Sequence, residues 1–248
     1  MASVPKRRLD QLLVDRGLAE SRSRAQALVM AGLVYSETKR PDKAGTQIRE
    51  DTPLELKGPD HPWVSRGGLK LDHGLDHFNY DVTGAICLDV GASTGGFTDV
   101  LLSRGAAKVY AVDVGHGQLA WKIRKDEQVI VLERTNARHI TSNEIPEAID
   151  FICCDASFIG LQTILPAPMK LAAQDAKMIA LIKPQFEVGK DQVGKKGVVR
   201  DPNLHQEVCD RISTWLDAFP DWRVDGIAKS PITGPEGNVE FLIAARHS

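Results

Sequence analysis

The sequence lacks a long apolar segment and an excess of charge of either sign. None of its apolar runs approaches the roughly 20 residues that cross a bilayer, and its first residues, MASVPKRRLDQLL, lack the apolar core of a signal peptide. A formal net charge of −2 on 248 residues gives no overall attraction to polyanions, so nucleic-acid binding would require local basic patches. We therefore expect a cytoplasmic protein with no membrane partner.

Cysteine is also scarce, and the four cysteines show neither metal-ligand nor disulfide spacing. They lie in or beside apolar runs, at Cys87, Cys153, Cys154 and Cys209. We expect buried thiols in a reducing compartment and no metal site.

The length and the hydrophobic content of 42% allow one large α/β domain and one small domain. Near the N-terminus, apolar residues recur at helical spacing from Leu9 and from Ala25, and Gly17 and Gly32 follow as helix stops. Short strand-like runs at 33–35 and 53–56 complete a small α+β domain over residues 1–62. Because residues 57–68 are rich in proline and glycine, we place a linker at 63–69 and the large domain at 70–248.

The stretch ICLDVGASTGGF, residues 86–97, organises the large domain. An apolar run ends in Asp89 and breaks into a glycine-rich turn before an amphipathic segment, which predicts a strand, a tight turn and a helix. Such a turn brings backbone N–H groups close to a ligand. Ser93 stands where a dinucleotide fingerprint has its second glycine, so the pattern favours a nucleotide-like ligand without the pyrophosphate of a dinucleotide.

Strands and helices alternate after this stretch in the rhythm of a parallel sheet. Strands are predicted at 86–90, 108–113, 129–132, 150–154 and 178–183, and helices at 70–78, 97–104, 116–124, 161–173 and 203–218. The last two strands, 223–229 and 239–245, have only SPITGPEGN between them and must pair as a hairpin. The predicted fold is a Rossmann-like, mostly parallel seven-stranded sheet with one antiparallel strand at one end.

Basic residues crowd the first two helices of the small domain, against Asp10, Asp15 and Glu20. A charge run of this kind is commonly a solvated face. The segment RLDQLLVDRGLAESRSRAQALVMAGLVYSE, however, resembles the S4 RNA-binding domain over roughly residues 7–66. The resemblance implies that RNA phosphates contact Lys6, Arg7, Arg8, Arg22 and Arg24.

The large domain resembles the S-adenosylmethionine-dependent methyltransferases, through its sheet and the D-x-G-x-x-x-G-G-F turn after the first strand. Asp113 ends the second strand, where an acid hydrogen-bonds the ribose hydroxyls of a nucleoside; a helix N-cap is the alternative role. The resemblance implies S-adenosylmethionine as cofactor, held by Asp89, Gly91, Ser93, Thr94, Gly95, Gly96, Phe97, Asp113, Asn136 and Ala137.

Four charged residues are predicted to meet at the carboxyl edge of the sheet. Asp155 follows the fourth strand, Lys183 follows the fifth, Glu240 begins the closing strand, and Lys70 comes from the preceding helix. Each alone could be a cap or a salt-bridge partner. Together they resemble the Lys-Asp-Lys-Glu tetrad of the FtsJ/RrmJ family of RNA ribose 2'-O-methyltransferases.

Methyl transfer from a sulfonium needs a nucleophilic oxygen that is aligned with the methyl carbon and has lost its proton. Lys183 is our candidate for orienting and deprotonating a ribose 2'-hydroxyl, and Asp155 would position it or relay the proton. Lys70 and Glu240 would hold that arrangement. Amino-group methylation would need an (N/D)PP(Y/F) turn where this chain has Asp155-Ala156-Ser157-Phe158, and a C5-cytosine mechanism would need a nucleophilic Cys153 or Cys154 inside a strand.

Residues 184–201, PQFEVGKDQVGKKGVVRD, form a long connection with basic residues among glycines. It is either a tolerated insertion or a lid over RNA, and its place directly after Lys183 favours the lid. In that role Lys190, Lys195 and Lys196 would contact RNA.

An S4 domain ahead of an FtsJ-like domain, joined through WVSRGGLKL, resembles the TlyA family over nearly the whole chain. That resemblance implies 2'-O-methylation of cytidines in 16S and/or 23S ribosomal RNA, with ribosomal RNA or ribosomal subunits as partners. The sequence does not fix the oligomeric state, and we favour a monomer. The alternatives are a non-catalytic ribosome-associated RNA-binding factor and a membrane-active haemolysin. The intact tetrad argues against the first, and the lack of a membrane-active segment argues against the second.

Overall fold

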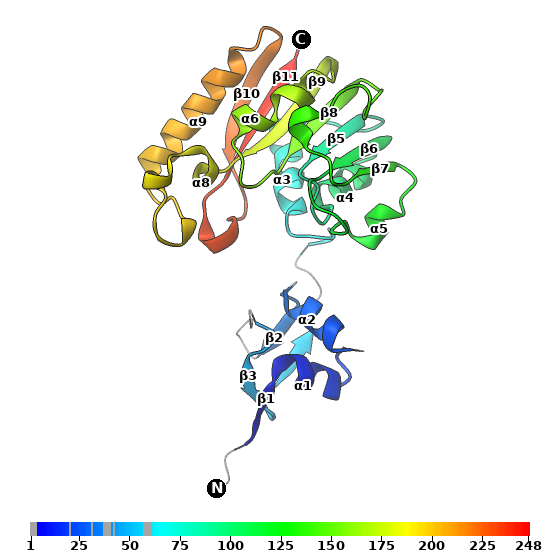
Figure 1. Ribbon diagram of the computed structural model, residues 1–248, viewed down its shortest axis with the longest axis vertical. Coiled ribbons are helices and arrows are strands. Elements are labelled where there is room, and N and C mark those ends of the chain that lie inside the picture. Colours follow the sequence, from blue (N-terminus) through cyan, green and yellow to red (C-terminus); the bar gives the residue numbers. More distant parts are fainter. Residues whose placement is uncertain (1–3, 20, 31, 37–40, 42, 57–60) are drawn as a thin grey trace. The chain divides into compact units, whose positions relative to one another are not determined.

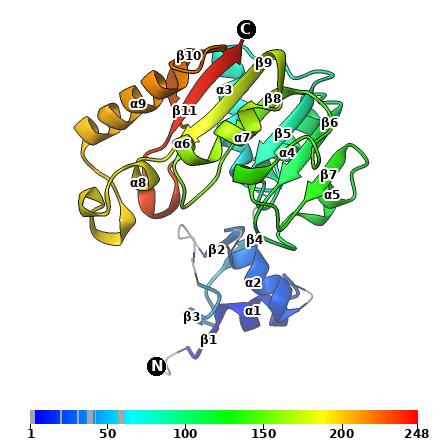
Figure 2. The ribbon, with the colours of Figure 1, turned by 45° about the horizontal axis from the view of Figure 1, so that its top comes forward.

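The computed structural model describes residues 4–19, 21–30, 32–36, 41, 43–56 and 61–248, with the side chains at 24, 27, 30, 190 and 235 outside that description. The chain divides into two compact units, Met1–Pro62 and Trp63–Ser248. Figures 1 and 2 show both units. Residues 63–69, expected as a linker, fall in the second unit, and a helix begins there at Gly68.

The first unit packs two helices against short strand pairs. Its elements are β1 (Lys6–Arg8), α1 (Leu9–Asp15), α2 (Arg22–Met30), β2 (Val34–Ser36), β3 (Gln47–Arg49) and β4 (Leu54–Leu56). The predicted apolar faces meet in one core, where Leu9, Leu13 and Ala25 are fully buried. β1 and β3 pair antiparallel and were not predicted, because three-residue strands with mostly polar side chains leave no alternation to detect.

The second unit is a seven-stranded sheet in the order β10-β11-β9-β8-β5-β6-β7. Its strands are β5 (Ile86–Val90), β6 (Lys108–Val112), β7 (Val129–Leu132), β8 (Ile149–Cys154), β9 (Ala172–Ile182), β10 (Trp222–Lys229) and β11 (Phe241–His247). Its α-helices are α3 (Gly68–Phe78), α4 (Gly96–Ser103), α5 (Trp121–Arg124), α6 (Leu161–Ile164), α7 (Pro166–Met169), α8 (Pro184–Glu187) and α9 (Pro202–Asp217). Short 3-10 turns occur at η1 (Ala137–His139), η2 (Lys190–Gln192), η3 (Lys195–Gly197) and η4 (Pro235–Gly237).

Helices cover both faces of this sheet, which confirms the predicted fold class. On one face Leu71 and Leu75 of α3 and Val100 of α4 pack against the strands. On the other face α6, α7 and α9 form the larger core, to which α9 contributes Ile212 and Leu216. The four cysteines are buried free thiols, as the sequence predicts.

Three predicted elements differ from the structure. The hairpin β10–β11 forms, but the antiparallel strand β11 lies between β9 and β10 and therefore inside the sheet, not at its end. The helix predicted at 161–173 is two short turns, because Pro166 and Pro168 lack a backbone donor, and β9 already begins at Ala172. The helix predicted at 116–124 is reduced to α5, since Gly115 and Gly117 precede it.

The strand order determines where a site can form. The chain builds β5, β6 and β7 outward in one direction and then places β8 on the other side of β5. This reversal leaves a crevice beyond the carboxyl ends of β5 and β8, where open α/β sheets bind their ligands. Because β11 runs antiparallel to β9, its beginning also lies at that edge.

Candidate active site

Two adjoining cavities open at the reversal point between β5 and β8. The larger, about 640 Å³, is lined by Asp113, Asn136 and Ala137 among others. The smaller, about 240 Å³, is lined by the four tetrad residues and by the turn before α4. Gly91, Ser93, Asp155 and Ser157 line both, so a molecule in one cavity borders directly on the other.

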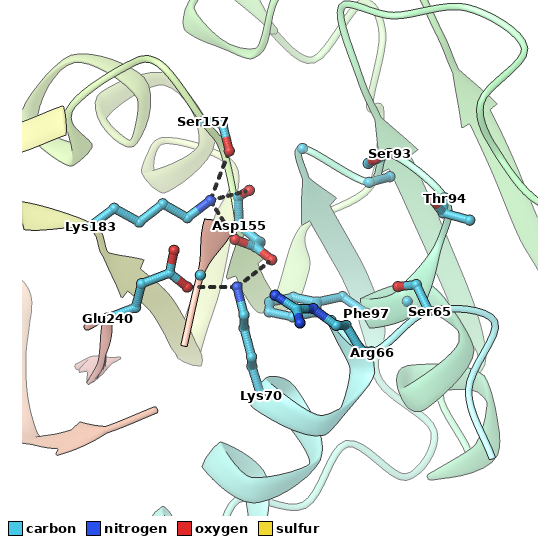
Figure 3. Close-up of a pocket in the computed structure, with 15 residues that line it drawn as sticks. Ser65, Arg66, Lys70, Ser93, Thr94, Phe97, Asp155, Ser157, Lys183 and Glu240 are labelled. Carbon is cyan, nitrogen blue, oxygen red and sulfur yellow. Dashed lines mark hydrogen bonds and ion pairs between the residues drawn. The ribbon is translucent and has the colours of Figure 1, made fainter. Parts of the chain in front are cut away.

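The four tetrad residues form one chain of alternating charges (Figure 3). Lys70 Nζ lies 2.7 Å from Glu240 Oε2 and 3.4 Å from Asp155 Oδ2. The other carboxylate oxygen of Asp155, Oδ1, lies 2.6 Å from Lys183 Nζ. Asp155 therefore bridges the two lysines, and the four formal charges cancel.

Because the four tetrad side chains are largely buried, their charges must be paired with one another. The side chains of Lys70, Lys183 and Glu240 are 9%, 7% and 1% exposed, against 20% for Asp155. A buried charge is tolerated only when it is paired and hydrogen-bonded. The more open Asp155 is thus the member of the chain that a substrate can reach most easily.

Lys183 has further partners on the loop after β8. Its Nζ donates to the carbonyl oxygen of Asp155 at 3.1 Å and to Ser157 Oγ at 2.9 Å. These contacts and the Asp155 carboxylate hold the ammonium group at the wall between the two cavities. Ser157 is thereby a site residue that the sequence analysis did not select.

Glu240 occupies a space that a glycine leaves open. A Cβ built on Gly234 would overlap Glu240 Oε1, so a larger residue there would force the Glu240 carboxylate to move. Gln185 Nε2 lies 3.5 Å from the same oxygen. The loop between β10 and β11 and the segment after Lys183 therefore both contribute to holding Glu240.

The glycine-rich turn brings backbone to the same crevice. Gly91 has φ +86°, and a Cβ on it would lie 3.0 Å from the backbone N and Cα of Ala156. Gly95 has φ +95° and is the N-cap of α4, where a Cβ would lie 2.9 Å from Leu119 Cδ1. Gly96, Thr94 and Phe97 line the smaller cavity. Gly95 itself lines neither cavity, so its role is conformational.

Gly91→Ala is expected to narrow the connection between the cavities, because the added methyl group meets backbone that cannot rotate away. We expect a loss of about 1–3 kcal/mol of unfolding free energy and a fall of at least about tenfold in nucleoside-ligand affinity. Thermal unfolding and calorimetric titration would measure the two effects.

Gly84→Ala is the matched control, because Gly84 has φ +73° with no atom within 4 Å of a built Cβ. Gly84→Ala has the same strain from a positive φ, which costs about 1 kcal/mol, but its added methyl group meets no neighbouring atom. Equal affinities in the two variants would contradict the steric role of Gly91.

Asp113 lies in the larger cavity with its carboxylate already anchored. Oδ2 accepts from Ser93 N at 2.8 Å and Oδ1 accepts from Gly115 N at 2.6 Å. The carboxylate thereby ties the turn after β5 to the loop after β6, and it keeps lone pairs for a ligand's hydroxyls. Asn136 and Ala137 line the same cavity, and Asn136 also caps η1 through Arg138 N.

Asp89 differs from its predicted role, because it lines neither cavity. Side chains alternate along a strand, and Asp89 points into the packing between β5 and α4, where it is fully buried and accepts from Thr98 Oγ1 at 2.7 Å. Burial raises the pKa of Asp89 to about 7. The hydrogen bond from Thr98 lowers the pKa, but by less than burial raises it. The alternation of side chains along 86–90 predicts this buried position. The motif resemblance was followed instead, and it placed Asp89 among the cofactor residues.

Asp89→Asn is expected to stabilise the protein at high pH. The folded-state pKa lies above the unfolded value of 3.8, so the contribution of Asp89 to stability is present below about pH 4 and is lost as the pH rises through 7. At pH 8 the variant should gain up to about 4 kcal/mol of unfolding free energy, and the gain should vanish near pH 4. Urea unfolding at both pH values measures this; Asp150→Asn, an exposed change on β8, should show no gain.

The FtsJ-like methyltransferase family matches residues 63–247, and the S4 domain matches residues 7–52. The Mycobacterium tuberculosis protein named 16S/23S rRNA (cytidine-2'-O)-methyltransferase TlyA is 47% identical over 240 residues, which cover 96% of this chain and 89% of that protein. The chain belongs to the TlyA family of FtsJ-like methyltransferases.

Other relatives carry a different name. Hemolysin A of Brachyspira hyodysenteriae is 39% identical over 95% of this chain and 98% of its own length. A solved structure from Streptococcus thermophilus, described as a candidate hemolysin, is 43% identical with a TM-score of 0.77, over 99% of this chain and 90% of that one. Among the described residues, no helix is both long and apolar enough to cross a membrane.

S-adenosylmethionine is the methyl donor of this family, and the larger cavity suits it. Asp113 offers a carboxylate for ribose hydroxyls, and the glycine turn allows close backbone approach. Cys153 and Cys154, the thiols considered for base methylation, are fully buried, and burial raises the pKa of Cys154 to about 12. Neither thiol lines either of the two adjoining cavities.

The basic residues expected at RNA whose side chains are described line neither cavity and are exposed. Lys6, Arg7, Arg8 and Arg22 are on the surface of the first unit, and Lys195 and Lys196 are exposed in η3. The side chains of Arg24 and Lys190 fall outside the described residues. The connection 184–201 contains α8, η2 and η3, and its end is tied to the loop before β11 where Val199 N donates to Asn238 Oδ1 at 3.2 Å.

Sequence reasoning also missed residues ahead of α3. Ser65, Arg66 and Gly67 line the smaller cavity, and Arg66 donates to the carbonyl oxygen of Thr233 at 3.1 Å. These residues could have been found from the sequence, because SRGG stands directly before the helix that carries Lys70. The stretch was assigned to the linker, so its residues were not considered as part of the site.

Proposed function

We propose that the protein transfers a methyl group from S-adenosylmethionine to the ribose 2'-hydroxyl of a cytidine in 16S and/or 23S ribosomal RNA. The observation that carries this proposal is the Lys70–Asp155–Lys183–Glu240 chain in a cavity that borders the cavity of Asp113. The names of the TlyA relatives supply the cytidine and the ribosomal RNA. A ribosomal substrate implies a cytoplasmic protein.

The bound donor supplies an electrophilic methyl group on a sulfonium. In this proposal Lys183 first passes one proton of its ammonium group to Asp155. The neutral Nζ then orients the 2'-hydroxyl and takes up its proton as the hydroxyl oxygen accepts the methyl group that the donor would release from its sulfonium sulfur. Asp155 Oδ1, at 2.6 Å, holds Lys183 in place and passes the proton on toward solvent through its more exposed carboxylate. Lys70 holds the opposite oxygen of Asp155 and is itself held by Glu240, so the carboxylate cannot rotate out of line.

In the same proposal residues 1–62 bind RNA, residues 63–69 connect the domains, and residues 70–248 carry out the transfer. The exposed guanidinium groups of Arg7, Arg8 and Arg22 suit RNA phosphates. Lys190, Lys195 and Lys196 would contact RNA from the segment that follows Lys183.

The direct test is tritium transfer from labelled S-adenosylmethionine to purified 16S RNA, 23S RNA and both ribosomal subunits, from cells that lack the enzyme. The RNA is then digested to nucleosides. We expect the label in 2'-O-methylcytidine; label in a base-methylated nucleoside would contradict ribose methylation. No incorporation into any of these RNAs would favour the non-catalytic RNA-binding factor.

A further inference from the structure

A buried carboxylate lies beneath the exposed arginines of the first unit. Asp10, in the first turn of α1, is 0% exposed. Arg8 Nε donates to its Oδ1 at 3.0 Å, and Arg8 Nη2 donates to its Oδ2 at 2.8 Å. Arg22 Nη2 and Gln26 Nε2 reach the same Oδ2 at 3.2 and 3.1 Å. One carboxylate thus fixes two guanidinium groups from different elements, β1 and α2.

The two arginines remain available to a ligand although they are fixed. The side chains of Arg8 and Arg22 are 44% and 54% exposed. Arg8 is bound in the parallel two-bond arrangement that leaves little rotational freedom, and a Cβ built on Gly45 would lie 3.3 Å from its Nη1. Arg8 is therefore confined from two sides, with one edge of its fork engaged by Asp10.

The donation from Arg8, followed by those from Gln26 and Arg22, holds the pKa of Asp10 well below its usual range. The carboxylate is therefore charged at any working pH. By charge alone it disfavours RNA, since it cancels one of the two positive charges beside it. A negative charge placed there needs a compensating benefit if the surface binds a polyanion.

We propose that Asp10 is a positioning residue for RNA recognition, which holds Arg8 and Arg22 as a preorganised pair for one phosphate group. This inference rests on the proposed function, because it takes RNA as the ligand. A free arginine loses rotamer freedom when it is fixed on a ligand, and Asp10 removes much of that loss beforehand. In this proposal the RNA affinity gained by fixing the two arginines exceeds the RNA affinity lost because Asp10 cancels one positive charge.

Asp15 provides a contrast within the same unit. It lies at the end of α1, is 36% exposed, and pairs with Arg7 at 2.6 Å. Arg7 also pairs with Glu50 at 2.8 Å, so it keeps a partner when Asp15 is neutral. Asp10→Asn and Asp15→Asn therefore make the same change of charge in the same helix, and only the first releases a buried clamp.

The experiment measures binding of the full-length protein and both variants to 16S and 23S RNA at several salt concentrations. Asp10→Asn is expected to bind about tenfold more weakly, the loss of one charge-assisted contact, with a salt slope shallower by about 0.7–0.9. Asp15→Asn should bind equally or up to about twofold more tightly. Because charge alone predicts tighter binding for both, Asp10→Asn binding as tightly as Asp15→Asn would overturn the proposal.

A merely structural role for Asp10 is separated by a double-mutant cycle. If Asp10 acts through Arg8 and Arg22, Asp10→Asn should cost little further affinity in an Arg8→Gln/Arg22→Gln background, whereas additive losses would overturn the proposal. Should far-ultraviolet circular dichroism show that Asp10→Asn unfolds the domain, Gln26→Met decides. That variant changes no charge and removes one donor to the carboxylate; we expect about twofold weaker binding, and unchanged binding would overturn the proposal.

Methylation assayed on the same RNAs separates this inference from the proposed function. Asp10→Asn should raise KM for RNA and leave kcat unchanged, because the tetrad lies in the other unit. If the wild type binds RNA and does not methylate it, the proposed function fails while the comparison of Asp10 with Asp15 still stands. A lower kcat with unchanged KM would overturn the inference.

Discussion

Replacing Lys183 with methionine is expected to lower kcat for methyl transfer by about 10³-fold, the usual range for loss of a general base. Methionine keeps most of the side-chain volume and removes the amino group that contacts Asp155 and Ser157. Cofactor affinity should change little, because Lys183 lines only the smaller cavity. Single-turnover tritium transfer and calorimetric titration of S-adenosylmethionine measure the two quantities.

Lys170→Met is the matched control, because Lys170 is an exposed lysine beyond the end of α7 and lines neither cavity. It should transfer methyl groups at the wild-type rate. Lys183→Met that is folded, binds cofactor and keeps near-normal transfer would contradict the role of Lys183 as the base.

The sheet could be predicted largely from sequence because its strands are short apolar runs bounded by glycine and acidic residues. The predicted boundaries of 86–90 and 129–132 coincide with β5 and β7. The order of the strands in space was harder, since nothing local in 223–245 indicates that β11 inserts between β9 and β10. Insertion follows from tertiary pairing of β11 with both neighbours, which is a non-local property.

The tetrad residues could be predicted from the sequence because three of them adjoin strand ends. Asp155 and Lys183 directly follow β8 and β9, and Glu240 directly precedes β11, so the topology brings them to one edge. Their pairing was not within reach, because distances such as the 2.6 Å between Asp155 and Lys183 depend on side-chain packing. The tetrad positions were expected from a resemblance; their roles in catalysis stay predictions.

Other features depended on which face of an element a residue occupies. The motif placed Asp89 with the cofactor residues, whereas the strand's alternation buries it against Thr98. Asp10 was weighed only as a counter-charge to nearby arginines, and its burial under two of them became visible only when β1 and α2 were placed together. In both cases the sequence shows that the residue is acidic, but it does not show that the carboxylate is buried or which side chains contact it.

Asp155→Asn is expected to affect both catalysis and stability, because one carboxylate serves two buried lysines. An amide can accept from one lysine and cannot neutralise either, so Lys183 is left 7% exposed without a counter-charge. Breaking a buried pair in this way costs about 3–5 kcal/mol. For a unit of this size that corresponds to a fall in Tm of about 10 °C, and kcat should fall by at least about 10²-fold.

The double variant Lys183→Met/Asp155→Asn separates the loss of pairing from the loss of packing. With the Lys183 ammonium group removed, Asp155→Asn should cost much less than it does alone, leaving a coupling of about 1–3 kcal/mol in thermal or urea unfolding. Additive losses would mean that Asp155 and Lys183 are not coupled and that Asp155 contributes through packing. Transfer by the double variant should be no slower than by Lys183→Met alone, because a carboxylate that only positions and relays for Lys183 has no function once that amine is gone.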